Sequence, residues 1–223
     1  MAINNIFSWG NVNFAHMVIG PIQTNVYLFF NDKGSFVVDP ADDCPAILAA
    51  LEAVEVDTPD SIVVTHAHFD HTGALAQLRQ ATGATVIASA IDAPAIENPD
   101  PTASRTLPPV QQCPVDRLVN DGEVVELCGL PWKVLVTPGH TPGSMCLYLA
   151  AEDNDGEHAL LISGDTLFRG AGGRTDFEGG SPAQMRESLQ RLSQLPDTTV
   201  VLPGHMKFTE IGAEQIGAFR LFG

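Results

Sequence analysis

Short apolar runs rich in Val, Ile and Leu alternate with amphipathic segments along most of the chain. Runs of about four to eight such residues, bounded by Gly, Pro or Asp, are typical of strands. In the first half they predict strands at 12–19, 25–30, 35–39, 62–65 and 85–88. Apolar side chains at helical spacing predict helices at 45–54 and 74–82.

The second half repeats this alternation, with strands predicted at 133–136, 145–149, 158–162 and 199–202. Asp121-Gly122 is predicted to be a hairpin turn between short strands. Ser181 and Pro182 predict the start of a helix, with Gln184 completing the cap. The apolar face of that helix carries Met185, Leu189 and Leu192. A further short helix is predicted at 213–222.

This order of strands and helices predicts an α/β (α+β) fold, a four-layer αββα sandwich in which two sheets are covered by helices on both sides. We interpret it as two similar halves forming a single domain over residues 1–223. Residues 98–114 are rich in proline and polar groups. They are predicted to link the halves or to form a loop over the site.

Four side chains that favour metal ions follow the apolar stretch 61–65 within six residues: His66, His68, Asp70 and His71. Alternation along an extended chain places the first three on one side, so His71 is expected to face elsewhere. Because one ion does not easily take all four, the spacing predicts two adjacent metal ions. The alternative interpretation is a polar loop with solvated histidines.

Three later apolar strands end in the same way, with a glycine and then a candidate ligand. Glycine allows the tight turn and the close approach of backbone to an ion that such a position requires. One such turn is weak evidence, but the repetition at several strand ends is a strong signal. The three pairs are Gly139-His140, Gly164-Asp165 and Gly204-His205.

The run from His66 to His71, with His140, Asp165 and His205, resembles the metallo-β-lactamase superfamily. Segments 20–28, 139–144, 164–170 and 203–205 are similar to its glyoxalase II-like (hydroxyacylglutathione hydrolase-like) branch. The resemblance begins near residue 12 and also implies the αββα architecture. Members of that branch typically carry a further helical domain that binds glutathione. Only 18 residues follow His205, so we expect a short form without it.

The resemblance implies a ligand set for two metal ions. One ion is held by His66, His68 and His140, and the other by Asp70, His71 and His205, with Asp165 bridging both. Asp70 and Asp165 are then the catalytic carboxylates. His68 stands where di-iron oxygen-reducing relatives have glutamate, which argues against that function. Imidazole and carboxylate donors suit zinc, iron or manganese, so we expect two divalent ions, with zinc as first choice.

The net charge restricts the partners that we expect for this protein, and the cysteine content indicates its compartment. Eleven basic and 27 acidic residues give a net charge of −16, which repels nucleic acid and anionic membranes, so we expect neither as a partner. No apolar run is long enough to span a membrane, and the first residues lack the charge of a signal peptide. The four cysteines form no CxxC pair, which is typical of a reduced, cytoplasmic protein. We expect a small, anionic substrate.

The glycine-rich segment 168–180 follows Asp165 and contains Arg169 and Arg174. An arginine fork placed there suits a substrate carboxylate, and Arg174 is preferred by analogy with glyoxalase II. The alternative is a plain connection whose arginines pair with Asp176 or Glu178. Lys207 is a second candidate anion contact or an ordinary surface lysine.

Three functions fit these features. We favour a dinuclear metallo-hydrolase of a thioester of the S-lactoylglutathione type. The second is a mononuclear-iron persulfide dioxygenase, which the chain resembles at 173–177 and which would use His66, His140 and Asp165. The third is a non-catalytic metal-binding module, which the seven intact ligands argue against. Another small ester or lactone is an alternative substrate, and a β-lactam is a weaker one.

Overall fold

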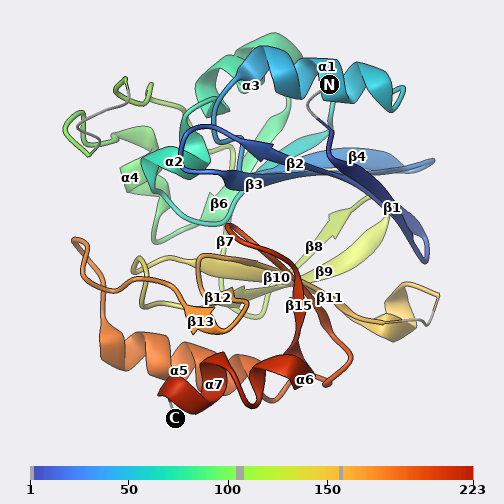
Figure 1. Ribbon diagram of the computed structural model, residues 1–223. Coiled ribbons are helices and arrows are strands. Elements are labelled where there is room, and N and C mark those ends of the chain that lie inside the picture. Colours follow the sequence, from blue (N-terminus) through green and yellow to red (C-terminus); the bar gives the residue numbers. More distant parts are fainter. Residues whose placement is uncertain (1–2, 104–107, 156–157, 223) are drawn as a thin grey trace. The chain divides into compact units, whose positions relative to one another are not determined.

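The computed structural model describes residues 3–103, 108–155 and 158–222 (Figure 1). The chain forms two compact units. Unit 1 contains residues 1–119 and 127–129, and unit 2 contains residues 120–126 and 130–223. The prediction of a single domain over 1–223 stays a prediction.

Unit 1 is built on a seven-stranded sheet in the order β1-β2-β3-β4-β5-β6-β7. Neighbouring strands from β1 to β4 are antiparallel, and those from β4 to β7 are parallel. The carboxyl ends of β4, β5 and β6 therefore lie at one edge of the sheet. The strands are β1 (Asn5–Trp9), β2 (Val12–Ile19), β3 (Thr24–Asn31), β4 (Gly34–Val38), β5 (Ser61–Val64), β6 (Thr85–Ser89) and β7 (Arg117–Val119).

Helices α1 and α3 cover one face of this sheet (Figure 1). Their apolar side chains pack into a buried cluster with alternate residues of β2 to β6, as the period of two along a strand requires. The opposite face carries buried aromatic residues, among them Phe29 and Phe36, whose rings stack at 4.7 Å. The helices of unit 1 are α1 (Cys44–Ala53), α2 (Phe69–Thr72), α3 (Leu75–Thr82) and α4 (Ala93–Glu97).

Unit 2 is built on a six-stranded sheet in the order β15-β14-β11-β10-β9-β8. Strand β10 is antiparallel to both of its neighbours, so β9 and β11 run in the same direction, and β14 is parallel to β11. The carboxyl ends of β9, β11 and β14 therefore lie at one edge. The strands are β8 (Val124–Leu127), β9 (Leu130–Val136), β10 (Met145–Leu149), β11 (Leu160–Gly164), β14 (Val200–Pro203) and β15 (Thr209–Glu210); β12 (Leu167–Phe168) and β13 (Ala171–Gly172) pair separately.

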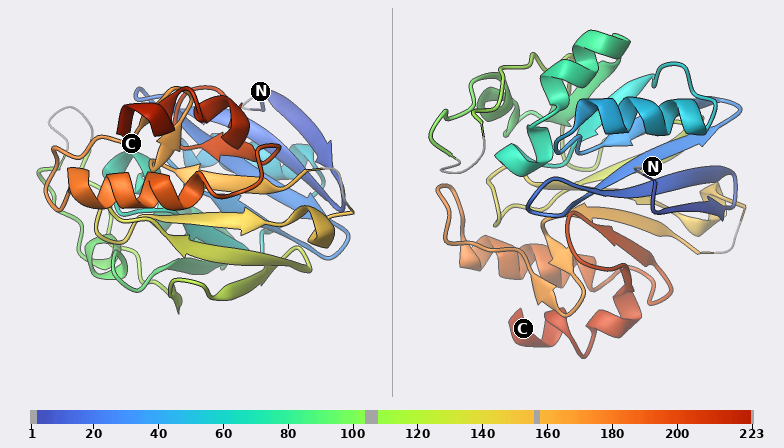
Figure 2. Two further views of the ribbon diagram at one scale, coloured as in Figure 1. Left: turned by 90° about the horizontal axis from the view of Figure 1, so that it is seen from below. Right: turned by 45° about the horizontal axis from the view of Figure 1, so that its top comes forward.

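Helices α5 (Pro182–Leu192), α6 (Ile211–Glu214) and α7 (Ala218–Phe222) lie on one face of the second sheet (Figure 2). The predicted start of α5 is confirmed, because the Ser181 hydroxyl accepts a hydrogen bond from the Gln184 amide at 3.3 Å. Its predicted apolar face is also confirmed: Met185, Leu189 and Leu192 are buried. A short 3-10 helix, η1 (Ala151–Asp153), follows β10.

Most predicted strands and helices agree with the structure to within one or two residues. The hairpin predicted at Asp121-Gly122 is wrong, because β7 pairs with β6 and β8 pairs with β9. The turn instead hydrogen-bonds to β9. The Gly122 amide donates to the Val134 carbonyl at 2.9 Å, and the Asp121 carboxylate accepts from the Val136 amide at 2.8 Å.

Two other predictions need correction. The helix predicted at 213–222 is two helices, α6 and α7. The chain turns between them at Gly217. The buried Glu214 carboxylate accepts a hydrogen bond from the Ala218 amide, at the first residue of α7. Segment 98–114 does not link the units, since the chain passes between them after Val119. Residues 104–107 of that segment lie outside the described part of the chain.

In the described ranges, none of the helices has the length and apolar character needed to cross a membrane.

Candidate metal centre

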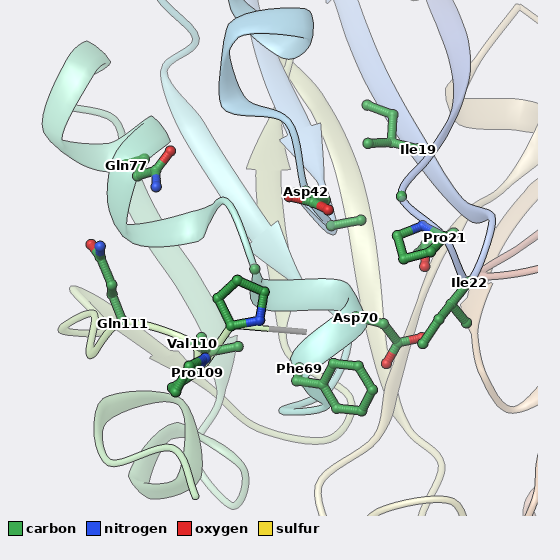
Figure 3. A pocket seen from close by; sticks show the side chains of 15 residues that line it. Ile19, Pro21, Ile22, Asp42, Phe69, Asp70, Gln77, Pro109, Val110 and Gln111 are labelled. Atoms are coloured by element: carbon green, nitrogen blue, oxygen red, sulfur yellow. The ribbon is translucent and has the colours of Figure 1, made fainter. Parts of the chain in front are cut away.

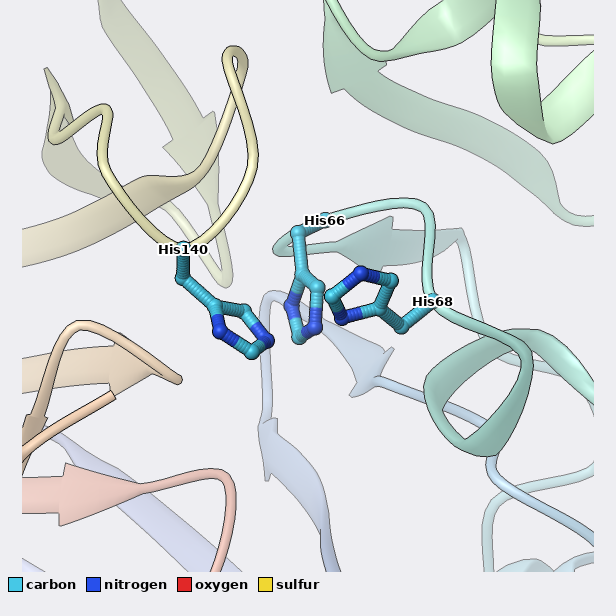
Figure 4. A group of neighbouring side chains, drawn as sticks. All are labelled: His66, His68 and His140. Atoms are coloured by element: carbon cyan, nitrogen blue, oxygen red, sulfur yellow. The ribbon is translucent and has the colours of Figure 1, made fainter. Parts of the chain in front are cut away.

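In unit 1, candidate ligands follow the parallel strands at their carboxyl ends, where α/β folds place their chemistry. Asp39 directly follows β4, and His66 and His68 lie on the loop after β5 (Figure 4). Asp70 and His71 lie on α2, immediately after that loop. The sheet topology therefore brings the predicted cluster beside Asp39, a residue that the sequence analysis did not select.

A continuous chain of hydrogen bonds joins Asp39 to two of the predicted ligands. The Asp39 Oδ2 atom accepts from the Thr65 hydroxyl at 2.7 Å and contacts His71 Nδ1 at 2.9 Å. The Thr65 hydroxyl in turn contacts His66 Nδ1 at 3.0 Å, and the Thr65 amide donates to Asp39 Oδ1 at 2.8 Å. All four side chains are buried.

These contacts determine which nitrogen of each ring carries the hydrogen. A carboxylate only accepts, so His71 donates from Nδ1. The Thr65 hydroxyl has given its hydrogen to Asp39, so it accepts from His66 Nδ1. In a neutral ring the lone pair then lies on Nε2, which is the arrangement that metal-binding histidines adopt when a second partner holds the other nitrogen. The donor set of unit 1 therefore fits a metal ion.

The expected orientation of His71 is wrong. Alternation along an extended chain stops at Phe69, because a helical turn begins there. The helical turn places the His71 ring 4.2 Å from the His66 ring between centroids, so His71 faces the same region and not elsewhere. The His66 and His68 rings lie 4.9 Å apart, and His71 Nε2 is 3.7 Å from Asp70 Oδ2. His66 and His71 are buried, and His68 and Asp70 are partly buried, which contradicts the alternative of a loop with solvated histidines.

A second acidic residue that the sequence analysis missed supports the histidine loop. Asp92 follows β6 and is 4% exposed, and its carboxylate accepts from the Ala67 amide at 3.0 Å. Ala67 lies between the first two predicted ligands. Both missed residues had a signal in the sequence, since each is an aspartate shortly after an apolar strand.

In unit 2 the three predicted ligands meet at one edge of the sheet. His140 follows β9, Asp165 follows β11 and His205 follows β14. Asp165 Oδ2 lies 3.4 Å from His140 Nε2 and 3.5 Å from His205 Nε2. His140 and Asp165 are buried, and His205 is partly exposed.

A backbone carbonyl orients His140. Its Nδ1 atom lies 2.7 Å from the carbonyl oxygen of Arg174, which only accepts, so His140 donates from Nδ1. In the neutral ring Nε2 is then an acceptor, and it faces a carboxylate oxygen that is also an acceptor. Two acceptors that face each other at 3.4 Å repel unless a cation lies between them, and a metal ion would supply that cation. This half of the donor set also fits a metal ion.

Glycine is required at two positions of this edge. Gly139 has φ +140°, and a Cβ atom there would lie 2.5 Å from the backbone of Met185 in α5. A Cβ at Gly173 would collide with the carbonyl oxygen of Asp165. The glycines predicted to permit close approach therefore do so between the ligand loops and their neighbours.

The predicted substrate contacts are both exposed. The Arg174 guanidinium forms a two-bond pair with the Asp176 carboxylate, at 2.9 and 2.7 Å, and lies 4.3 Å from the centre of the Phe177 ring. These hydrogen bonds lower the pKa of Asp176 below its usual value. The pairing with Asp176 matches the alternative reading of this arginine, and the role of Arg174 and Lys207 in substrate binding stays a prediction.

The cysteines do not offer a nucleophile. All four are free and buried. Burial raises the pKa of Cys146 to about 11 and that of Cys128 to about 12, and it also raises the pKa of Cys44 and Cys113. Because the thiolate is the reactive form, these side chains are unreactive at neutral pH.

A family model described as the metallo-beta-lactamase superfamily matches residues 19–205. The chain is 32% identical over 207 residues to a probable metallo-hydrolase, YqgX, of Bacillus subtilis, covering 92% of this chain and 95% of that protein. It is 30% identical over 209 residues to the hydroxyacylglutathione hydrolase GloC of Haemophilus influenzae, covering 92% and 95%. A hydroxyacylglutathione hydrolase of Ectopseudomonas mendocina is 39% identical over 169 residues, which span 76% of this chain and 55% of that protein.

Solved structures agree. A B3 metallo-beta-lactamase, BLEG-1, has a TM-score of 0.84 at 34% identity and covers 94% of this chain and 100% of that one. TTHA1623 in a di-iron-bound form has a TM-score of 0.79 at 36% identity, with coverages of 91% and 98%. ETHE1 from Myxococcus xanthus has a TM-score of 0.76 at 28% identity, with coverages of 94% and 84%. The chain belongs to the metallo-beta-lactamase superfamily, has its fold, and has relatives of the glyoxalase II type.

Proposed function

We propose that this protein is a metal-dependent hydrolase of thioesters of the S-lactoylglutathione type. The observation that carries the proposal is the orientation of the donors. His66, His71 and His140 each have Nδ1 engaged by a hydrogen-bond partner, which leaves Nε2 to bind a cation. Family membership and the hydroxyacylglutathione hydrolase relatives support the same class of reaction.

For the ligands we keep the assignment that the family resemblance implies. His66, His68 and His140 would hold one ion, Asp70, His71 and His205 would hold the other, and Asp165 would serve as a ligand to both. Zinc, iron and manganese all match these nitrogen and oxygen donors, and zinc is our first choice. Two such ions would polarise the carbonyl group of the substrate and lower the pKa of the attacking water.

The chain's own residues have three tasks in this scheme. The Asp39–Thr65 chain holds the His66 and His71 rings with Nε2 outward. The carboxylates of Asp70 and Asp165 orient the attacking water by accepting hydrogen bonds from it. Arg174 and Lys207 bind the carboxylates of the substrate, where charge-assisted hydrogen bonds are strongest.

No residue has to serve as a general acid. The leaving group of a thioester is a thiol, whose ordinary pKa of about 8.5 makes the thiolate stable enough to depart unaided. The oxygen of water forms its bond to the acyl carbon as the C–S bond breaks, and the thiolate then takes up a proton. We keep the expectation of a small, anionic substrate, and the net charge of −16 argues against nucleic acid and anionic membranes as partners.

The test combines metal analysis with product analysis. The metal-replete protein should contain about two transition ions per chain and should cleave S-lactoylglutathione under argon. In water labelled with heavy oxygen, one labelled atom should appear in the carboxylic acid. A single ion per chain, or a need for oxygen, would contradict the proposal. A lactone, a simple ester and a β-lactam in the same assay separate the other hydrolase substrates.

The second candidate is a persulfide dioxygenase with one iron ion. Similarity to ETHE1 from Myxococcus xanthus favours it, as does the segment 173–177. Here His66, His140 and Asp165 alone would hold the iron. Glutathione persulfide should then consume oxygen rapidly while thioesters remain intact, with one iron per chain.

A further inference from the structure

A cavity of about 170 Å³ lies in unit 1 beside Asp70, and the proposed metal centre does not account for it. Its walls come from four segments: the turn between β2 and β3, residues 41–42 between β4 and α1, the stretch from α2 into α3, and the loop at 108–111. Figure 3 shows Phe69 and Asp70 on α2 between the turn that carries Ile22 and the loop that carries Val110. A cavity of this size is below the range of about 300–1,000 Å³ typical of sites for whole drug-sized ligands. It therefore fits one small group of a substrate.

The lining of the cavity presents apolar and polar surface in nearly equal amounts, and its one charge outside the proposed metal ligands is that of Asp42. Its apolar side chains include Ile19, Ile22, Phe69 and Val110, together with three prolines. Of the described residues around the cavity, none is lysine or arginine. Its two acidic residues are Asp70, a proposed metal ligand, and Asp42. The Asp42 carboxylate thus gives the cavity a negative charge, and a carboxylate entering there would be repelled.

Tight backbone contacts fix the segment that carries this exposed carboxylate. The Ala74 amide donates to the Pro40 carbonyl at 2.9 Å, and a Cβ at Gly73 would collide with the carbonyl oxygen of Ala41. Gly20, at φ +76°, lies so close that a Cβ there would be 3.3 Å from the Cβ of Asp42. The turn and the start of α3 therefore both pack against the segment that carries Asp42. The cavity is a built feature of unit 1.

We propose that this cavity binds the acyl group of the thioester and selects acyl groups that are short, apolar and uncharged. The proposal rests on thioester hydrolysis as the proposed function and names the substrate class of that site. Ile22 explains the choice of an apolar group. It is 44% exposed at the tip of the turn and lines the cavity, so it offers apolar surface to a group that enters there. Gln77 and Gln111 also line the cavity and offer amides to a hydroxyl on the acyl group.

Three glutathione thioesters test the selection by kcat/KM: S-acetyl, S-butanoyl and S-succinyl. Butanoyl and succinyl differ only in a methyl group against a carboxylate. Burial of apolar groups is expected to favour butanoyl over acetyl by about fourfold per methylene, or roughly fifteenfold for the two methylenes. Succinyl should be cleaved at least about tenfold less efficiently than butanoyl, because Asp42 repels it.

Charge reversal gives the sharpest variant. Asp42→Lys should raise the succinyl-to-butanoyl ratio by about tenfold or more. Asp57→Lys is the matched control, because Asp57 is exposed in the same unit and does not line the cavity, so it changes the net charge equally. An equal change in both variants would overturn the proposal. Ile22→Trp should fill the cavity and lower kcat/KM for butanoyl but not for acetyl, whereas Ile216→Trp, on the surface of unit 2, should alter neither.

A binding measurement separates failure of this inference from failure of the proposed function. Isoleucine methyl groups are followed by NMR as S-butylglutathione, a thioether that is not hydrolysed, is added. The methyl signals of Ile19 and Ile22 should shift, and those of Ile6 and Ile216 should not. S-(3-carboxypropyl)glutathione should shift them much less. If thioesters are cleaved but these signals stay still, the cavity is not the acyl site. If no thioester is cleaved, the proposed function fails, and the shifts alone decide whether the cavity binds a neutral alkyl group.

Discussion

The two units present their candidate ligands by different means. In unit 1 a buried side chain, Asp39, holds His71 directly and His66 through Thr65. In unit 2 a backbone carbonyl, that of Arg174, holds His140. A carboxylate makes the imidazole it contacts more basic as well as orienting it, while a carbonyl mainly orients it. Substitution of Asp39 therefore removes the partner that holds the histidines of unit 1. Substitution of Arg174 leaves the backbone carbonyl that holds His140 in place.

The difference extends to the ligands themselves. Asp165 contacts two histidines of its own unit through one oxygen, so it organises the whole half-set of unit 2. Asp70 Oδ2 of unit 1 lies 3.7 Å from Nε2 of His71, which follows it directly in the chain. We therefore expect metal binding in unit 2 to depend mainly on Asp165, which is a proposed ligand. Metal binding in unit 1 should depend mainly on Asp39, which is not a proposed ligand.

The largest effect is expected for Asp165→Ala. Loss of the proposed bridging ligand should remove at least one metal ion per chain and lower thioesterase activity by more than about a hundredfold, which exceeds the usual cost of losing an outer partner. Elemental analysis and kcat/KM measure both effects. Asp153→Ala, an exposed aspartate of the same unit, is the control. Full metal content in Asp165→Ala would contradict its bridging role.

Asp39→Ala should have the next largest effect. It leaves His71 and Thr65 without their buried acceptor, which should weaken metal binding by about ten- to a hundredfold. The unpaired groups should also lower the free energy of unfolding by at least about 2 kcal/mol. Metal titration and urea unfolding measure the two effects.

Asp39→Asn separates orientation from folding. Asp39 has φ +51°, a conformation that Asn tolerates and Ala does not, and the amide oxygen of Asn still accepts from the Thr65 amide. This variant should regain most of the stability and little of the metal affinity. Thr65→Val should lower the metal affinity less, because it removes the hydroxyl that links Asp39 to His66 and leaves the contact between Asp39 and His71 in place. Normal metal affinity in both variants would show that Asp39 serves folding alone.

Arg174→Ala tests the arrangement in unit 2, where a backbone carbonyl holds His140. It removes the guanidinium but not the carbonyl that holds His140, so metal content should stay unchanged. KM for an anionic glutathione thioester should rise about ten- to a hundredfold, and KM for a neutral thioester should change little. Lys133→Ala, which removes an exposed positive charge elsewhere in unit 2, is the control. Equal effects on both substrates would give Arg174 a structural role.

The smallest effects compare one surface ion pair in each unit. Hydrogen bonds from Arg79 and from the Val86 amide lower the pKa of Asp116. Burial alone would raise the pKa of Asp121, but hydrogen bonds from Arg191 and the Val136 amide lower it overall. Because the side chains are about a third to a half exposed, we expect Asp116→Asn to cost about 1 kcal/mol and Asp121→Asn about 0.5 kcal/mol at neutral pH.

The sign of the pH dependence follows from these lowered pKa values. A carboxyl group with a lowered folded pKa stabilises the fold above its unfolded pKa of about 3.9, and this contribution is lost as the pH falls through the folded value. In urea unfolding, the difference between each variant and the wild type should therefore be full at pH 7 and shrink below pH 4. A difference that grows on acidification would contradict the assignment.

The amino-acid sequence by itself determined most of the longer strands, the capped helix α5 and the identity of the candidate ligands, but not strands such as β1, β12 and β15. These features are local, since each depends on a short apolar run, a capping residue or a glycine before a polar residue. The cluster from His66 to His71 and the later Gly-His and Gly-Asp pairs can be seen without any knowledge of what lies beside them.

Tertiary structure decided everything that depends on pairing between distant segments. Asp39 contacts His71 only because β4 and β5 are parallel neighbours, and His140 lies beside Asp165 only because β10 reverses the chain between β9 and β11. The helical turn that begins at Phe69 places the His71 ring beside the His66 ring, whereas the alternation of an extended chain predicts that His71 faces elsewhere. Short-range patterns do not specify these choices, because partners for backbone hydrogen bonds and buried charges are selected by the whole sheet.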